Sequence, residues 1–157
     1  MALSPIRCCL HIALAASFVA CEAPGTVVGK ATLHGEGSVG TQFTRGKGRV
    51  EIWAKFAGKW QGSKYSKLPI LWTIDLTQGT KRLGQVVCDS EATEGTLYCG
   101  TTTNVGGIIS EDCEVRLACA LPFLEVGEVV VVTVTGKKKD PKRIHEIREM
   151  SLVFREL

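Results

Sequence analysis

Apolar and polar residues alternate along most of this chain from residue 26 onward. The clearest stretch is residues 49–57, where apolar side chains occupy every second position, at Val50, Ile52, Ala54 and Phe56. An alternation of period two places these side chains on one face of an extended strand, where they can be buried together. The same pattern predicts strands at residues 26–33, 49–57, 68–76, 83–88, 96–99, 113–119, 128–135 and 150–154.

Other segments depart from this alternation. Residues 34–48 and 100–112 are polar and rich in glycine, which predicts loops. Residues 128–135 contain a run of consecutive valines, which predicts a central strand covered on both of its faces. Residues 144–149 are predicted to begin with a helical turn before the last strand.

Seven to nine short strands, with no convincing helix after the first 20 residues, indicate an all-β domain. We therefore expect residues 26–157 to form one antiparallel β-sandwich, immunoglobulin-like or jelly-roll-like. A small closed β-barrel is the alternative architecture. Trp72 lies on an apolar face of its strand and is predicted to belong to the core.

Residues 1–20 have the layout of a signal peptide. Arg7 is their only charge, and the apolar stretch that follows it is about a dozen residues long. That is too short for the roughly 20 residues that a membrane-spanning helix needs. The segment is therefore predicted to direct export and to be removed.

The residues Phe18-Val19-Ala20-Cys21 resemble the processing site of a bacterial lipoprotein. The resemblance implies cleavage before Cys21 and a cell-envelope protein held to a membrane by acyl chains on that cysteine. Multiple acyl chains hold a protein firmly where one chain would not. Residues 21–25 would then be a short tether. Plain secretion is the alternative, and a cytosolic protein whose N-terminal helix packs on its own core is a further one.

The cysteines divide into two groups. Three lie in or directly after the predicted signal, and the other four are Cys88, Cys99, Cys113 and Cys119. In an oxidising compartment an even number of clustered cysteines predicts two disulfides. A zinc site is disfavoured, because no Cys-x-x-Cys pair occurs and the spacings are irregular.

Chain geometry narrows the possible pairings. If residues 113–119 form a strand, Cys113 and Cys119 lie about 20 Å apart, whereas a disulfide needs Cα atoms within about 7 Å. Two pairings remain, namely 88–119 with 99–113, or 88–113 with 99–119. The nested arrangement, 88–119 with 99–113, is favoured because it closes a hairpin-like excursion.

Charge and motifs argue against several function classes. The formal net charge of +3 is too mild to imply nucleic-acid binding. No Gly-x-Ser-x-Gly, His-Glu-x-x-His or phosphate-binding loop motif occurs. His34 and His145 lack supporting motifs and are predicted to be surface residues. The sequence therefore predicts no catalysis, no metal and no cofactor.

Acidic pairs are the one pattern that points to chemistry. They are Asp89 with Glu91 and Glu94, and Glu111 with Asp112. Paired carboxylates serve as acid and base in glycoside cleavage, and carboxylate oxygens bind calcium. Regular calcium-loop spacing is missing, however, and charged loops at the tips of a sandwich are usually solvated.

Aromatic and basic residues between positions 53 and 65 form the best candidate binding site. Exposed rings stack on sugar faces, and lysines add contacts to anionic groups. The predicted platform consists of Trp53, Lys55, Lys59, Trp60, Lys64 and Tyr65. The competing interpretation is that a loop covers Trp53 on the face opposite the core.

Together these patterns predict a lipid-anchored envelope module that recognises a polysaccharide or a partner protein. An inhibitor or assembly accessory of another envelope protein is the alternative. A glycan hydrolase that uses the acidic loops is a weaker one. The basic run at residues 137–143 is predicted to be a solvated turn, or a contact to an anionic surface.

Overall fold

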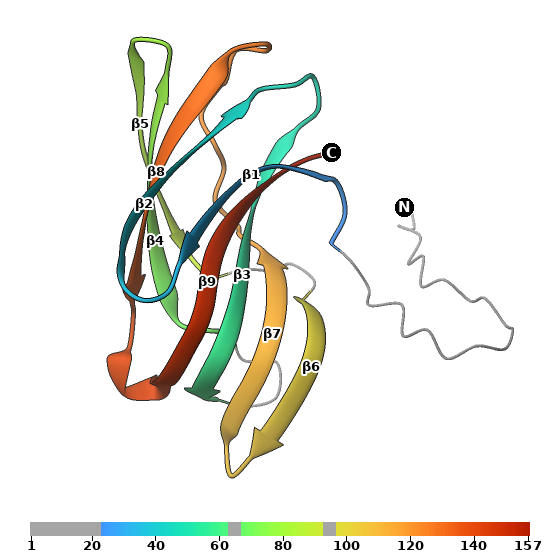
Figure 1. Ribbon diagram of the computed structural model, residues 1–157, viewed down its shortest axis with the longest axis vertical. Coiled ribbons are helices and arrows are strands. Elements are labelled where there is room, and N and C mark those ends of the chain that lie inside the picture. The colour runs from blue at the N-terminus through green and yellow to red at the C-terminus, as the bar shows by residue number, and fades with distance from the viewer. Residues whose placement is uncertain (1–22, 63–66, 93–96) are drawn as a thin grey trace, which may run out of the picture.

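The computed structural model describes residues 23–62, 67–92 and 97–157, which form two packed antiparallel sheets (Figure 1). One sheet has the order β1-β9-β3-β7-β6, and the other has the order β2-β8-β4-β5. A single turn of 3-10 helix, η1 (Pro141–Arg143), precedes the last strand. The strands are β1 (Thr26–Leu33), β2 (Gly37–Thr44), β3 (Val50–Gln61), β4 (Ile70–Gln78), β5 (Lys81–Asp89), β6 (Leu97–Val105), β7 (Ile108–Arg116), β8 (Val129–Lys138) and β9 (Ile144–Glu156).

The predicted β-sandwich is therefore confirmed, and the two sheets do not close into a barrel. The chain changes sheet at every connection except two, because β4 and β5 are neighbours in one sheet and β6 and β7 are neighbours in the other. This winding is that of a jelly roll, with β6 added as an edge strand beside β7.

The inner faces of both sheets meet in one apolar core. Alternate residues of β4 are fully buried, as the sequence pattern predicts, and Trp72 is 0 % exposed. Phe154 of β9 stacks on Phe43 of β2 at a centroid separation of 5.2 Å, which joins the two sheets through aromatic packing. The largest fully buried side chains are Trp60, Trp72, Phe56, Phe154, Ile52, Leu68, Ile70, Ile74, Leu76, Met150 and Leu152.

Two predicted loops are in fact strands. The segment 34–48 contains β2, which pairs with β8 along its whole length although only Phe43 is buried. The segment 100–112 contains parts of β6 and β7, joined at Gly106 and Gly107, which have φ values of 61° and 80°. Two consecutive residues of positive φ form the tight turn that suits a two-residue β-hairpin.

Three further predictions are corrected. β8 is central, but Val129 and Val131 are 44 % and 46 % exposed, so only its other face is covered. Residues 144–149 are strand rather than helix, because η1 ends at Arg143. The strand predicted to reach Cys119 ends at Arg116, and the chain leaves the sheet there.

Close packing of β3 on β9 gives the first testable prediction. Gly58 lies at a β-bulge, where a Cβ atom would overlap the carbonyl oxygen of Glu146. The neighbour is backbone and cannot turn aside, so Gly58→Ala is expected to lower the free energy of unfolding by about 1–3 kcal/mol. Urea unfolding followed by tryptophan fluorescence measures this change.

Gly40 of β2 provides the matched control, because its added Cβ atom would lie 3.9 Å from the nearest atom. Gly40→Ala is expected to be neutral or to stabilise by about 0.4–1 kcal/mol. Equal losses in the two variants would contradict the tight β3–β9 contact.

Candidate functional site

The predicted aromatic platform does not form, because both of its tryptophans are buried. The strand predicted at residues 49–57 continues as β3 to Gln61 and keeps the Trp60 ring on the inner face, where it is 0 % exposed. There the indole makes an edge-to-face contact with Phe56 at a centroid separation of 5.3 Å. Trp60 is therefore a core residue.

Trp53 lies on the outer face of the five-stranded sheet, as predicted, yet it is only 3 % exposed. The ring of Tyr98 lies 5.7 Å away, the guanidinium of Arg155 lies 6.0 Å from the indole centroid, and Ala23 packs into the same cluster. These groups come from distant parts of the chain. Their cover removes the indole face from any stacking on a sugar.

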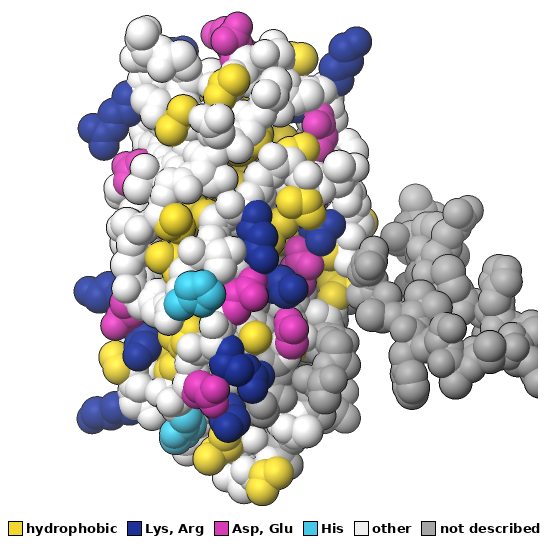
Figure 2. Space-filling view, in the orientation of Figure 1, with side chains coloured by type: hydrophobic (Ala, Val, Ile, Leu, Met, Phe, Trp, Pro, Cys, Tyr) yellow, Lys and Arg dark blue, Asp and Glu magenta, His cyan; other side chains and the backbone are white. Residues whose placement is uncertain are grey.

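The lysines of the predicted platform are not brought together with exposed rings. Lys55 is half-buried on the outer face, and Lys59 is exposed and forms an ion pair of 3.1 Å with Glu146. Lys64 and Tyr65 lie outside the described residues. On the face shown in Figure 2, basic and acidic side chains are interspersed, so this face presents no broad patch of one sign.

The acidic loop after β5 is neutralised by the basic turn before β9. Lys139 forms ion pairs with Asp89 at 2.5 Å and with Glu91 at 3.2 Å. Arg143 contacts Glu91 at 2.8 Å. The basic turn is therefore partly used inside the fold and is not entirely solvated.

These contacts also decide the protonation of Asp89. Burial alone would raise the pKa of its carboxyl group, but the hydrogen bonds from Lys139 and from the backbone of Glu91 outweigh burial and hold that pKa below its usual value. A general acid for glycoside cleavage needs a raised pKa instead. Asp89 is thus suited to an ion pair and unsuited to proton donation.

The remaining predicted chemistry is not assembled in the described residues. Asp112 is exposed, whereas Glu94 and the side chain of Glu111 lie outside the described residues. His34 and His145 are both exposed, as predicted. Within the described segments no group of three or more His, Cys, Asp and Glu side chains could hold a metal ion.

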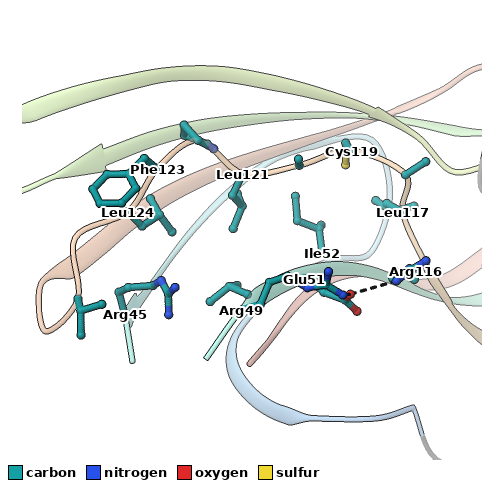
Figure 3. Close-up of a pocket in the computed structure, with 15 residues that line it drawn as sticks. Arg45, Arg49, Glu51, Ile52, Arg116, Leu117, Cys119, Leu121, Phe123 and Leu124 are labelled. Atoms are coloured by element: carbon teal, nitrogen blue, oxygen red, sulfur yellow. Dashed lines mark hydrogen bonds and ion pairs between the residues drawn. The ribbon is translucent and has the colours of Figure 1, made fainter. Parts of the chain in front are cut away.

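A pocket of about 500 Å³ lies beneath residues 117–128, the connection between β7 and β8, which we call the strap (Figure 3). The volume falls within the range of ligand-binding pockets. Strap residues form one wall, and the start of β3 with the segment before it forms the other. The lining residues are Arg45, Arg49, Val50, Glu51, Ile52, Arg116, Leu117, Ala118, Cys119, Ala120, Leu121, Pro122, Phe123, Leu124 and Val126.

Contacts fix the strap at both ends and between them. Its first part is joined to β5 by the Cys88–Cys119 disulfide, with Cα atoms 5.4 Å apart. Further along, the buried amide of Gln78 donates to the carbonyl of Glu125 and accepts from its N–H, both at 2.9 Å. At its far end the strap exchanges backbone hydrogen bonds with Arg45: Gly127 N donates to Arg45 O at 2.7 Å, and Arg45 N donates to Glu128 O at 3.0 Å.

The disulfide confirms one half of the favoured pairing and excludes both 88–113 and 113–119. Cys113 is also disulfide-bonded, and the strand register places Cys99 directly opposite it. That register is the one that the nested arrangement requires. The 99–113 bond remains a prediction, since the side chain of Cys99 lies outside the described residues.

Arginines dominate the charge at the pocket. The Glu51 carboxylate is only 9 % exposed, and the same oxygen accepts hydrogen bonds from Arg49 and, at 3.1 Å, from Arg116. Arg45 forms a longer ion pair of 3.4 Å with Glu156. Three arginines and one glutamate line the pocket, which therefore carries a positive charge beside its apolar wall.

Leucines supply the apolar wall. Leu117 and Leu124 are buried and Leu121 is half-buried, whereas Phe123 and Val126 are 85 % and 56 % exposed. Phe123 and Val126 extend the apolar surface at the edge of the pocket, and contiguous exposed apolar surface of this kind marks binding sites. The sequence did contain a signal, because residues 117–124 are all apolar, whereas connections between strands are usually polar.

No family model, curated protein or solved structure matches this chain. In the described segments no helix has the length and apolar character needed to cross a bilayer. The function must therefore be argued from the chemistry of the site itself.

The disulfide that holds the strap gives a second prediction. Replacing both Cys88 and Cys119 by alanine is expected to lower the free energy of unfolding by about 2–4 kcal/mol. Alanine is used because Cys88 is buried and a serine hydroxyl would add its own desolvation cost. Urea unfolding of the unreduced protein measures the change, and a loss below about 0.5 kcal/mol would contradict the structural role of this bond.

The ion pair of Asp89 gives a prediction for acid pH. Because folding lowers the pKa of this carboxyl group, its contribution to stability is present above the unfolded value of about 3.9 and is lost as the pH falls through the folded value. Asp89→Asn keeps the oxygen that accepts from the N–H of Glu91 but removes the charge. Between pH 5 and pH 3 the free energy of unfolding should fall in both proteins. In the variant this fall should be smaller than in the wild type by up to about 1 kcal/mol.

Asp75→Asn is the control, because Asp75 is more exposed and its ion pair with Arg82 is longer, at 3.5 Å. Urea unfolding at several pH values measures both variants. An acid dependence of Asp89→Asn identical to that of the wild type would disprove the assignment.

Proposed function

We propose that this chain is a non-catalytic binding module of the bacterial cell envelope, anchored through acyl chains on Cys21, and that its ligand binds in the strap pocket. The anchor is supported by the likeness of residues 18–21 to a lipoprotein processing site. The ligand site is supported by one observation above all. Arg49 and Arg116 share a single nearly buried carboxylate at the mouth of an apolar pocket.

The chemistry of the pocket defines the ligand class. Each guanidinium has five N–H donors, and in the described chain each of these two side chains contacts only Glu51. Donors therefore remain for an anionic group, which arginine binds through strong charge-assisted hydrogen bonds. The half-buried Leu121 and the exposed Phe123 and Val126 of the strap provide apolar surface beside those donors. The ligand is thus an amphipathic anion, with a phosphate or carboxylate next to an apolar group.

Binding rather than catalysis is supported by the state of the acidic groups. Asp89 and Glu91 are committed to Lys139 and Arg143, and the lowered pKa of Asp89 suits an ion pair. A neutral polysaccharide is a poorer ligand than first expected, because the rings of Trp53 and Trp60 are covered. An anionic polymer or an acidic partner protein would fit this ligand class only if it also carried an apolar group that contacts the apolar side chains of the strap.

Hexyl phosphate is a suitable probe, because it joins a phosphate to a short apolar chain. The protein as processed by the cell is held in nanodiscs of phosphatidylcholine, and its melting temperature is followed by tryptophan fluorescence. Binding to the folded state should raise the melting temperature by roughly 2–4 °C for each kcal/mol of binding free energy. Inorganic phosphate has only the anionic group and hexanol has only the apolar chain, so each should raise the melting temperature less than hexyl phosphate does.

Two arginines of similar exposure give a matched pair of variants. Arg49 is 70 % exposed and bonds Glu51 at the pocket, whereas Arg82 is 77 % exposed and bonds Asp75 on β5. Arg49→Gln should reduce the shift caused by hexyl phosphate, and Arg82→Gln should keep it. Equal shifts in both variants, or none in the wild type, would exclude the strap pocket as the site.

A further inference from the structure

Residues 23–25 are fixed against the outer face of the five-stranded sheet. Ala23 is 6 % exposed and packs with Trp53, Val153 and the half-buried Tyr98. The segment therefore contacts the domain before β1 begins. Residues 23–25 therefore belong to the packed domain, and only residues 21 and 22 of the predicted tether lie before it.

Arg155 holds this segment in place. Its Nε and Nη2 atoms donate to the two carboxylate oxygens of Glu114, at 2.8 and 3.1 Å. Its Nη1 atom donates to the carbonyls of Ala23 at 3.2 Å and Gly25 at 3.1 Å. Only 13 % of the Arg155 side chain is exposed, and its bonds to Glu114 and Ala23 are partly buried, whereas the bond to Gly25 is exposed. We call this arrangement the Arg155 clamp.

Gly25 lets residues 23–25 lie close to the end of β9. Its φ of +86° lies in the region that favours glycine. A Cβ atom there would lie 2.7 Å from Leu157 Cδ2 and 2.8 Å from the carbonyl oxygen of Glu156. The segment is therefore pressed against the end of β9 and has little freedom to swing.

The clamp lies beside the mouth of the pocket. In the strand register Arg155 is directly opposite Glu51, and Trp53 is directly opposite Arg116. Residues paired in this way have Cα atoms about 5 Å apart. Residues 23–25 and the arginines of the pocket thus occupy one end of the same sheet.

A short link remains between this end and the proposed anchor. Two chain steps separate Cys21 from Ala23, and they span at most about 7 Å. If Cys21 is acylated, as the proposed function requires, the clamp holds the pocket mouth close to the lipid headgroups. An unclamped tether would instead let the domain turn freely.

We infer that the strap pocket binds the headgroup of an anionic phospholipid from the membrane that holds Cys21. The lipid phosphate would lie at Arg49 and Arg116, and an apolar part of the lipid would contact the half-buried Leu121 of the strap. The exposed Phe123 and Val126 would enter the interfacial layer, as apolar side chains of peripheral proteins do. Arginines near such a surface are further attracted by its negative potential.

Native mass spectrometry of the cell-processed protein tests this inference together with the anchor. The protein is released from nanodiscs that contain equal amounts of phosphatidylglycerol and phosphatidylcholine. One spectrum gives both the covalent mass of the chain and the lipids that it retains. We expect retention of one phosphatidylglycerol in preference to phosphatidylcholine, and a roughly tenfold loss of this preference in Arg49→Gln.

Two controls separate the pocket from general charge and hydrophobicity. Arg82→Gln removes an arginine of similar exposure elsewhere, and Val105→Ser removes a 77 % exposed apolar residue at the β6–β7 turn. Both should retain lipid as the wild type does, whereas Phe123→Ser should retain less.

Each outcome has a distinct meaning. An acylated chain that retains no phosphatidylglycerol, or retains both lipids equally, would overturn the lipid inference and leave the anchor intact. An unacylated Cys21 with no retained lipid would overturn both. An unacylated chain with Arg49-dependent retention would support the lipid site and reject the anchor. A retained peptide in place of lipid would assign the pocket to a protein partner and overturn the inference.

Discussion

The attachment of the strap to the sandwich is the constraint on which the candidate site depends. The strap is a connection of a dozen residues that carries leucines and a phenylalanine. Without attachments, such a segment would pack against the nearest apolar surface and close the pocket. The Cys88–Cys119 bond, the paired hydrogen bonds of Gln78 and the backbone exchange with Arg45 hold it at separate points. Because these points belong to β5, β4 and the end of β2, the sandwich itself keeps the pocket open.

The second constraint is electrostatic. A carboxylate that is only 9 % exposed accepts bonds from two arginines and so brings their guanidinium groups together, while the arginine side chains themselves are 70 % and 48 % exposed. A carboxylate so poorly solvated would be costly without its partners, and the arginines keep donors to spare. The same end of the sheet carries the Arg155 clamp, where one guanidinium bonds a carboxylate and two backbone carbonyls. Arginines therefore bind carboxylates at the pocket and also hold residues 23–25 against the same end of the sheet.

Local patterns in the sequence predicted the features that depend on local structure. The first strand was predicted at residues 26–33 and is observed there, Trp72 is in the core, and Cys88 pairs with Cys119. Two neighbouring glycines, Gly106 and Gly107, also marked a hairpin turn, but the polar composition around them masked it.

The candidate site could not be predicted in the same way, because distant segments build it. Trp53 was on the expected face, but its cover comes from Ala23, Tyr98 and Arg155. Periodicity says which face a residue occupies and not what lies over that face. Trp60 was missed because the strand was predicted to end at residue 57. The alternation of buried positions in β3 in fact continues unbroken to Trp60, and the extra residues at the two bulges lie in β9.

Hydrogen–deuterium exchange on the cell-processed protein tests the central claim most directly, namely that the strap end faces the membrane and holds lipid. Exchange is compared between nanodiscs of phosphatidylglycerol and a neutral detergent. We predict slower exchange in residues 117–126, with no change at the β6–β7 turn, which lies at the opposite end of β7 (Figure 1). Protection at that turn, or unchanged exchange throughout the strap, would contradict it.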